Sequence, residues 1–171
     1  LWKELKVVIP QEEFFVNENC YSNIGTNSKR LVVYFSRMGY VKLKALEEAD
    51  QTGAELYEVK STELTEGTKG FWWCGRYGMH RWEMPIEPID IDLSRYEHVT
   101  ICSPIWVFNL SAPMRSFCKQ ASGLIKEADY ILVHHNKTDY KNAADEMDSL
   151  LRIKHTGLKS FCCREGKFKK V

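Results

Sequence analysis

The residues of this chain best suited to chemistry fall in two short segments, each placed after an apolar run. The first segment follows residues 31–35 and reads Ser36-Arg37-Met38-Gly39-Tyr40-Val41. A tight turn between a strand and a helix presents backbone N–H groups and the positive end of a helix dipole, which favour an anion. Gly39 permits close backbone approach, Ser36 adds a hydroxyl and Arg37 adds charge. Taken alone, a serine and a glycine in such a turn are more often structural than functional.

The second segment suits a flat ring rather than an anion. It follows residues 99–102 and reads Ser103-Pro104-Ile105-Trp106-Val107-Phe108-Asn109. Trp106 and Phe108 are large flat side chains beside backbone amides, so a heteroaromatic ring could stack there while N–H groups bond its polar edge. An equally weighted alternative is that Trp106 caps the hydrophobic core under the loop.

Alternating strands and helices are predicted to position these two segments. Strands are expected at residues 31–35, 55–60, 99–102, 130–133 and 158–163. Helices are expected from Val41 to Gly53, from Pro113 to about Gly123, and from an N-cap at Asp139 to Leu151. This alternation predicts an α/β three-layer sandwich with a five-stranded parallel sheet. With strand order 2-1-3-4-5, the two segments would face each other where the strand order reverses, which is where open sheets bind ligands.

Two regions fall outside this alternation. Residues 1–29 are interpreted as an N-terminal extension of the domain at residues 30–171, with a short strand at residues 5–9 and a linker from Asn17 to Lys29. Residues 61–92 contain several glycines and prolines and are expected to be irregular. That region is nevertheless rich in aromatic residues, so it is expected to pack over something: Phe71, Trp72, Trp73, Tyr77 and Trp82.

Composition narrows the class of protein. The chain has 171 residues, 27% of them charged, and a formal net charge of +1, so a general affinity for nucleic acid or for an acidic membrane is not expected. Its 6 cysteines include no C-x-x-C pair, which argues against a zinc or iron–sulfur site. Without a signal-peptide pattern or an apolar run of about 20 residues, we expect a cytoplasmic protein with free thiols. The basic residues near the end are expected to form a solvated tail: Arg164, Lys167, Lys169 and Lys170.

The two segments together resemble a known family. Residues 29–39 resemble the opening of flavodoxin-like proteins, in which a strand leads into a phosphate loop of the form Ser-x-Thr-Gly-x-Thr. Residues 101–106, followed by Pro113, resemble the second flavin loop of that family. The resemblance implies FMN as cofactor, with residues 36–41 around the phosphate and residues 104–109 along the ring. It further implies that His135, Asn136 and Lys137 approach the other side of the ring, and that the stretch near Trp73 can reach the flavin.

The sequence departs from the family pattern in two ways. Met38, Tyr40 and Val41 stand where the family often has Thr, Asn and Thr, so two hydroxyl donors to phosphate are missing. Each lost hydrogen bond to a charged group corresponds to about 1.5–3 kcal/mol. The chain also ends at Val171, shortly after the fifth predicted strand, which leaves no room for the family's final helix. Residues 1–29 are expected to cover the face that this helix would cover.

Two classes of function follow from these observations. The first is an FMN-binding redox protein, either an electron carrier or an NAD(P)H-dependent reductase of a quinone-like acceptor, working with a redox partner protein or NAD(P)H. The net charge of +1 favours the reductase or a specialised redox partner, because dedicated flavodoxin carriers tend to be strongly acidic. The second is a binding module whose phosphate loop has degenerated and whose segment 71–82 recognises another protein. No acid–base residue is assigned, and a homodimer, common among flavodoxin-like reductases, is left open.

Overall fold

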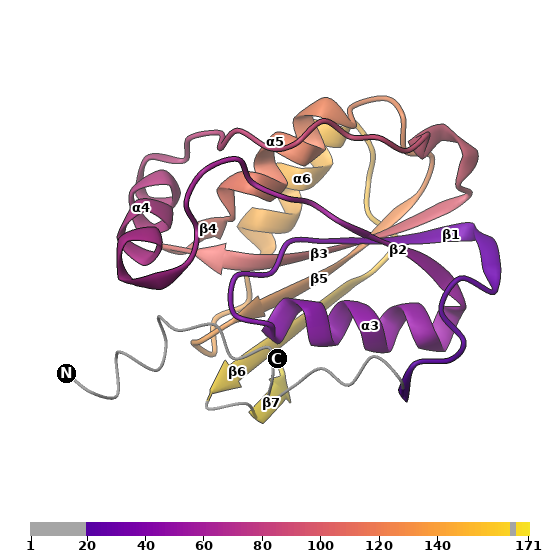
Figure 1. The fold of residues 1–171 in the computed structure, drawn as a ribbon, viewed down its shortest axis with the longest axis horizontal. Helices are drawn as coiled ribbons and strands as arrows, with labels where there is room; N and C mark the ends of the chain where they lie inside the picture. Colours follow the sequence, from indigo (N-terminus) through magenta and orange to yellow (C-terminus); the bar gives the residue numbers. More distant parts are fainter. Residues whose placement is uncertain (1–19, 165–166) are drawn as a thin grey trace.

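The computed structural model describes residues 20–164 and 167–171 of the chain (Figure 1). The predicted strand at residues 5–9 and most of the predicted N-terminal extension lie outside the described residues. The described part begins its sheet earlier than predicted, because β1 runs over Asn27–Tyr34 and so includes three residues assigned to the extension.

Five parallel strands form the centre of the sheet. Counted along the chain, their order is the predicted 2-1-3-4-5, which in the labels of Figure 1 is β2-β1-β3-β5-β6. The strands after β1 are β2 (Ala54–Glu58), β3 (His98–Trp106), β5 (Ala128–His134) and β6 (Leu158–Arg164). Two antiparallel strands that the sequence did not predict complete the sheet: β4 (Asn109–Leu110) pairs with β3, and β7 (Lys167–Lys170) extends the edge beyond β6.

Both faces of the sheet are covered, which explains why the central strands read as continuous apolar runs. Along β1, Leu31 and Val33 belong to the core on one face, while Val32 and Tyr34 belong to the core on the other. Helix α3 (Tyr40–Thr52) covers the second face and is the one helix there within the described ranges (Figure 1). It begins at Gly39 and ends at Gly53, both with a left-handed backbone that glycine adopts readily.

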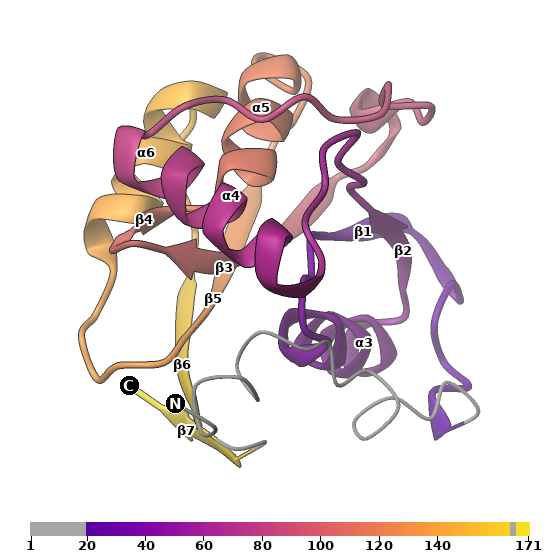
Figure 2. The ribbon, with the colours of Figure 1, turned by 60° about the vertical axis from the view of Figure 1, so that its left-hand side comes forward.

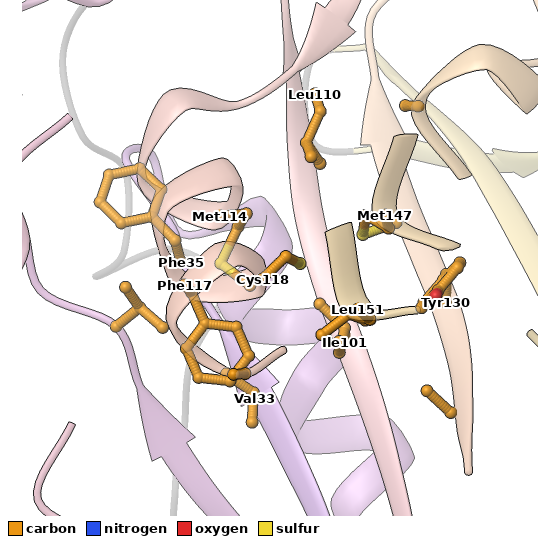
Figure 3. Close-up of a cluster of buried hydrophobic side chains, with 14 of the residues drawn as sticks. Val33, Phe35, Ile101, Leu110, Met114, Phe117, Cys118, Tyr130, Met147 and Leu151 are labelled. Atoms are coloured by element: carbon orange, nitrogen blue, oxygen red, sulfur yellow. The ribbon is translucent and has the colours of Figure 1, made fainter. Parts of the chain in front are cut away.

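Two helices cover the first face, so the three-layer sandwich is confirmed. They are α5 (Ala112–Gln120) and α6 (Lys141–Leu151). Figure 3 shows their side chains meeting the strands: Met114, Phe117 and Cys118 come from α5, Met147 and Leu151 from α6, and Val33, Ile101 and Tyr130 from the sheet. The predicted N-cap of α6 was wrong, because the helix starts from Tyr140 without a side-chain cap and Asp139 instead lies 3.8 Å from Lys141 Nζ.

The largest correction lies in residues 61–92. Helix α4 occupies Gly67–His80 there, followed by a short 3-10 turn at Leu93–Arg95. Figure 2 shows α4 crossing the end of the sheet next to β3 and β4. Its buried positions are the small residues Gly70, Cys74 and Gly78, spaced four apart, while Trp72 and Met79 point outward and Tyr77 packs partly buried against the core. Trp72 is 71% exposed and Met79 is 65% exposed, so the apolar pattern that usually marks a surface helix is inverted.

The segment after residue 102 was also predicted as loop but continues as strand to Trp106. Pairing between β1 and β3 stops at Cys102, whereas β3 continues beside β5 as far as Pro104 opposite Val133. Among the described strands, none pairs with residues 103–104 of β3 on the side that faces β1. A proline, which has no N–H, is tolerated at such a position.

One buried arginine holds the elements around this end of the sheet together. Arg115 of α5 is 4% exposed and donates from Nε to Glu146 Oε1 of α6 at 2.5 Å. The same guanidinium donates to the carbonyl oxygens of Trp82 and Leu110, each at 3.0 Å. Arg115 thus ties α6, the segment after α4 and strand β4 to one point.

Candidate functional site

A cavity of about 320 Å³ opens at the carboxyl edge of the sheet, between the ends of β1, β3 and β5. Its size is at the lower end of the range for small-molecule sites. The predicted site residues that line it come from both predicted segments and from the stretch at residues 135–137: Ser36, Arg37, Met38, Tyr40, Val41, Pro104, Ile105, Trp106, Val107 and His135. Phe71, Cys74 and Gly75 also line it and belong to the stretch near Trp73 that was expected to reach a ligand, although Trp73 itself does not line the cavity. The remaining lining residues were not predicted: Val133, His134 and Cys163.

The turn between β1 and α3 forms one end of the cavity. Gly39 has φ 89°, and its N–H donates to Ser36 Oγ at 3.0 Å, so the turn is closed by the serine side chain. The Ser36 hydroxyl accepts this bond and keeps its own hydrogen for donation. Gly39 itself is absent from the lining. Helix α3 has no acidic residue in its first turn, so the positive end of its dipole is not offset by a carboxylate there.

Arg37 adds a cation to this end of the cavity. Its side chain is 8% exposed, and its guanidinium carbon lies 5.4 Å from the centre of the Phe71 ring. Burial lowers the pKa of Arg37, and the charge of Glu66 acts in the opposite direction. A guanidinium remains protonated near neutral pH, so the cavity carries a buried positive charge. A buried cation beside a helix N-terminus favours an anionic ligand group.

Next to this cation the cavity wall is apolar. Met38, Tyr40 and Val41 are each less than one tenth exposed and belong to the core under α3. The Tyr40 ring meets the His135 ring edge-on, with centroids 6.2 Å apart. Met38 and Val41 therefore supply shape and packing rather than the hydroxyl donors of the family's loop.

The end of β3 supplies the second wall. Trp106 is 9% exposed and meets the Phe35 ring edge-on at 5.6 Å, so it both packs on the core and lines the cavity. Trp106 therefore caps the core, as one of the two alternatives predicted, while its stacking on a ligand ring stays a prediction. Ser103 lies outside the cavity, since it is fully buried in the strand with its Oγ 2.9 Å from Ser111 Oγ.

The turn after Trp106 is tight and held from several sides. Val107 and Phe108 have φ 48° and 64°, an unfavourable region for residues with a branched or bulky side chain. Asn109 Nδ2 donates to the carbonyl oxygens of Val107 at 2.9 Å and Gly78 at 3.2 Å. Asn142 Nδ2 donates to the Phe108 carbonyl oxygen at 3.1 Å. Strain of this kind clusters at functional sites. Of the predicted residues, Phe108 and Asn109 shape this turn without lining the cavity.

The loop after β5 forms the third wall. His134 is buried and both its ring nitrogens have partners 2.6 Å away, the Asn136 carbonyl oxygen and Ser160 Oγ. Burial lowers the pKa of His134, which favours the neutral ring. His135 points its Nδ1 at the Cys163 carbonyl oxygen, at 2.8 Å, and lines the cavity. Asn136 lies outside the lining, where its Oδ1 accepts a hydrogen bond from the Tyr140 hydroxyl.

Helix α4 covers the cavity from the side and was missed at the level of sequence. Phe71, Cys74 and Gly75 line the cavity, and a Cβ added at Gly75 would have no neighbour within 4 Å. Burial raises the pKa of the Cys74 thiol to about 12, so the thiol is neutral. The spacing of small residues at Gly70, Cys74 and Gly78 was the one signal of a helix in this segment.

The described residues give little support to other kinds of site. Within residues 20–164 and 167–171 no group of three or more His, Cys, Asp or Glu side chains is arranged to hold a metal ion. The longest helix there has 14 residues, and none combines the length and hydropathy needed to cross a membrane. The cavity with a cation at one end and aromatic rings along its walls remains the site with definite ligand chemistry: an anionic group joined to a flat, mostly apolar body.

Comparison with known proteins gives a result by structure only. The sequence matches no protein-family profile and no curated protein. Among solved structures, a candidate flavoprotein from Bacteroides uniformis ATCC 8492 aligns with TM-score 0.67 and 19% identity, over 81% of this chain and 94% of its own. A candidate flavoprotein from Bacteroides eggerthii DSM 20697 aligns with TM-score 0.66 and 20% identity, over 78% and 88%. A flavoprotein from Lactobacillus acidophilus NCFM, solved in complex with FMN, aligns with TM-score 0.62 and 20% identity, over 78% and 93%. Together with the strand order, these alignments show that the chain has a flavodoxin-like fold.

Proposed function

We propose that the cavity binds FMN and that the protein uses it for redox chemistry. The observation that carries the proposal is that one cavity offers two binding environments, one for an anionic group and one for a flat ring. Arg37 and the N-terminus of α3 stand at one end, and aromatic and apolar groups from β3, α4 and the loop after β5 stand along the walls. A solved relative by fold carries FMN, which supports the choice among flat anionic ligands.

The residues present fit FMN in character. In the proposed complex, Arg37, the Ser36 hydroxyl and the first turn of α3 hold the phosphate. The stretch from Pro104 to Val107, with His135 and Phe71, encloses the ring and keeps water from it. Bound FMN supplies one- and two-electron transfer, while the protein binds, orients and tunes it.

The redox role takes one of two forms. The protein is either an electron carrier or an NAD(P)H-dependent reductase of a quinone-like acceptor. The net charge of +1 favours the reductase or a specialised redox partner over an acidic carrier. The Val107–Phe108 turn, 41% and 66% exposed, lies at the edge of the cavity where an acceptor would approach the ring.

A titration with two flavins tests the proposal. We expect purified protein to be yellow or to take up FMN at micromolar concentration, and to bind riboflavin, which lacks the phosphate, more weakly. Arg37→Met keeps much of the side-chain volume but removes the charge, so FMN affinity should fall about tenfold to a hundredfold while riboflavin affinity changes little. Arg152→Met, at the exposed C-cap of α6, is the matched control and should bind both flavins as wild type. Colourless protein that takes up no FMN would overturn the proposal.

The alternative is a binding module whose phosphate loop has degenerated. It is favoured by Met38 and Val41, which line the cavity at positions where the family carries hydroxyls. The double variant Met38→Thr and Val41→Thr separates the two proposals. A large gain in FMN affinity from near zero would support the degenerate module, whereas tight binding by the wild-type protein would exclude it.

A further inference from the structure

The hairpin of β6 and β7 concentrates positive charge at one edge of the sheet. The register of the two strands sets Lys167 opposite Arg164 and Lys169 opposite Cys162. Residues directly opposite each other, and alternate residues of one strand, project from the same face of a sheet. Arg164, Lys167 and Lys169 therefore share one face, while Lys170 projects from the other. We call these four exposed residues the basic edge.

No described carboxylate neutralises the charge of the basic edge. Among the described parts of the chain, no carboxylate lies within ion-pair distance of any of its four residues. Arg164 instead donates from Nε to the carbonyl oxygen of His135 at 2.9 Å. Like charges placed directly opposite in a ladder are unfavourable, so the Arg164–Lys167 pair weakens the hairpin. With a net charge of only +1 for the whole chain, this is a local concentration of charge.

The basic edge also adjoins the cavity. Arg164 bonds the backbone of His135, whose side chain lines the cavity, and Cys163, which lines it too, pairs with Phe168 of β7. Figure 1 shows β7 as the outermost strand, next to the end of β6. A partner held on the basic edge would therefore lie at the rim of the proposed flavin site.

We propose that the basic edge docks an acidic extended segment of the protein that exchanges electrons with this site. The identity of the partner as a redox protein rests on the proposed function, whereas the charge and the strand edge belong to the chain itself. β7 has four residues and so spans about 13 Å at about 3.3 Å per residue. Among the described strands it is the last in the order β2-β1-β3-β5-β6-β7, and no described strand pairs with its outer edge, which suits strand addition. Carboxylates along such a segment would pair with the lysines of the basic edge.

Other occupants fit less well. A second copy of this edge would set lysine against lysine, the arrangement by which natural edge strands avoid pairing. A membrane surface needs apolar groups beside the cations. Phe168, the aromatic residue of β7, is turned inward. Its ring centre lies 6.1 Å from that of Tyr40 and 4.4 Å from Lys44 Nζ. Because this ring points inward, β7 presents no exposed aromatic ring on which the bases of single-stranded nucleic acid could stack.

Binding of a fluorescein-labelled oligoglutamate peptide, followed by anisotropy, tests this surface. We expect wild-type protein to bind the peptide, and to bind it less tightly as salt is raised. Lys167→Glu with Lys169→Glu should weaken binding about tenfold or more, since it reverses two charges at the contact. The matched control reverses two exposed lysines that form no ion pair with a described residue, Lys60→Glu with Lys126→Glu, and should remain within about twofold of wild type. The neutral pair Lys167→Gln with Lys169→Gln should give an intermediate loss and serves if the reversed variant melts early.

The outcomes separate the alternatives. Equal losses of peptide affinity in the two charge-reversed variants would mean that binding depends on the overall charge of the protein, and would overturn the proposal. Tighter binding of phosphatidylserine vesicles or of an oligonucleotide through the same lysines would replace the acidic partner with a membrane or a nucleic acid. The titration is run with and without added FMN. Lysine-dependent peptide binding without any FMN uptake would overturn the proposed redox function alone. FMN uptake without lysine-dependent peptide binding would overturn the proposed docking surface alone.

Discussion

Gly78 of α4 lies against Trp106 of β3 so closely that a Cβ at position 78 would come within 2.9 Å of both the Trp106 Cβ and its carbonyl oxygen. This contact places α4 directly on the strand end that lines the cavity. The Gly78 carbonyl oxygen also accepts a hydrogen bond from Asn109, so the helix and the turn after Trp106 are joined at the same glycine.

A methyl group at Gly78 should therefore push α4 away from the sheet. We expect Gly78→Ala to lower the free energy of unfolding by about 1–3 kcal/mol, the usual range for overpacking. Gly75→Ala, on the same helix, adds the same group where nothing lies within 4 Å, and better helix propensity should raise stability by up to about 1 kcal/mol. Urea denaturation of the pair decides the matter. Equal stabilities for the two variants would contradict the close packing at Gly78.

Arg115 should be the most sensitive charged residue around the site. Arg115→Met leaves the Trp82 and Leu110 carbonyl oxygens without this donor and removes the buried partner of Glu146. Because Arg81 still pairs with Glu146, we expect a loss of about 2–4 kcal/mol, at or below the usual cost of breaking a buried pair. Arg81→Met, whose side chain is 59% exposed, is the control and should lose less than about 1 kcal/mol. Denaturant midpoints at fixed pH measure both, and similar losses would refute the distinction.

Stability should also depend on pH through His98. Its Nε2 lies 2.7 Å from Asp129 Oδ1 and its Nδ1 lies 2.9 Å from Glu127 Oε1. The hydrogen bond to Asp129 raises the pKa of His98, against burial and the charge of Arg30. A raised pKa means stabilisation that is complete below the unfolded value near 6.5 and is lost as pH rises through the folded value.

His98→Gln should remove this pH dependence. We expect the difference in unfolding free energy between wild type and variant to be largest near pH 6 and to shrink toward alkaline pH. Denaturation curves across that interval provide the measurement. A difference that grows with rising pH would show that His98 is not stabilised as the cation.

Thiol reactivity should follow burial. Cys20 is the one exposed cysteine, and the other five are buried. Burial raises the pKa of Cys74 to about 12 and that of Cys102 well above its usual value. Alkylation of native protein with iodoacetamide at mild alkaline pH, read by peptide mass spectrometry, should label Cys20 first and Cys74 only after unfolding. Rapid labelling of Cys74 would mean that the cavity wall opens in solution.

The sheet was predictable because its strands carry their own signal. Residues 31–35 are apolar on both sides since both faces of β1 are covered, and the turn at Gly39 and the end at Gly53 follow from the glycine backbone. Asp139 was wrongly assigned as a cap because sequence spacing alone does not distinguish it from the neighbouring Tyr140.

Helix α4 and strand β7 were missed for different physical reasons. In α4 the glycines read as loop punctuation, but Gly70 and Gly78 are needed for close approach, since a Cβ at either would clash with backbone atoms. Its outward aromatic residues remove the amphipathic pattern that identifies a surface helix. In β7 the lysines resemble a solvated tail, and only pairing with β6 makes the segment a strand. Cavity residues such as Cys163 follow from these tertiary arrangements, so no local pattern could assign them.

The position of Trp106 in the cavity wall has an optical consequence. Indole emission overlaps the near-ultraviolet absorption of an oxidised flavin, and excitation energy passes almost completely between an indole and a flavin in contact. Where FMN fills the cavity as proposed, the intrinsic fluorescence of the protein should fall, and this signal would report occupancy without a label.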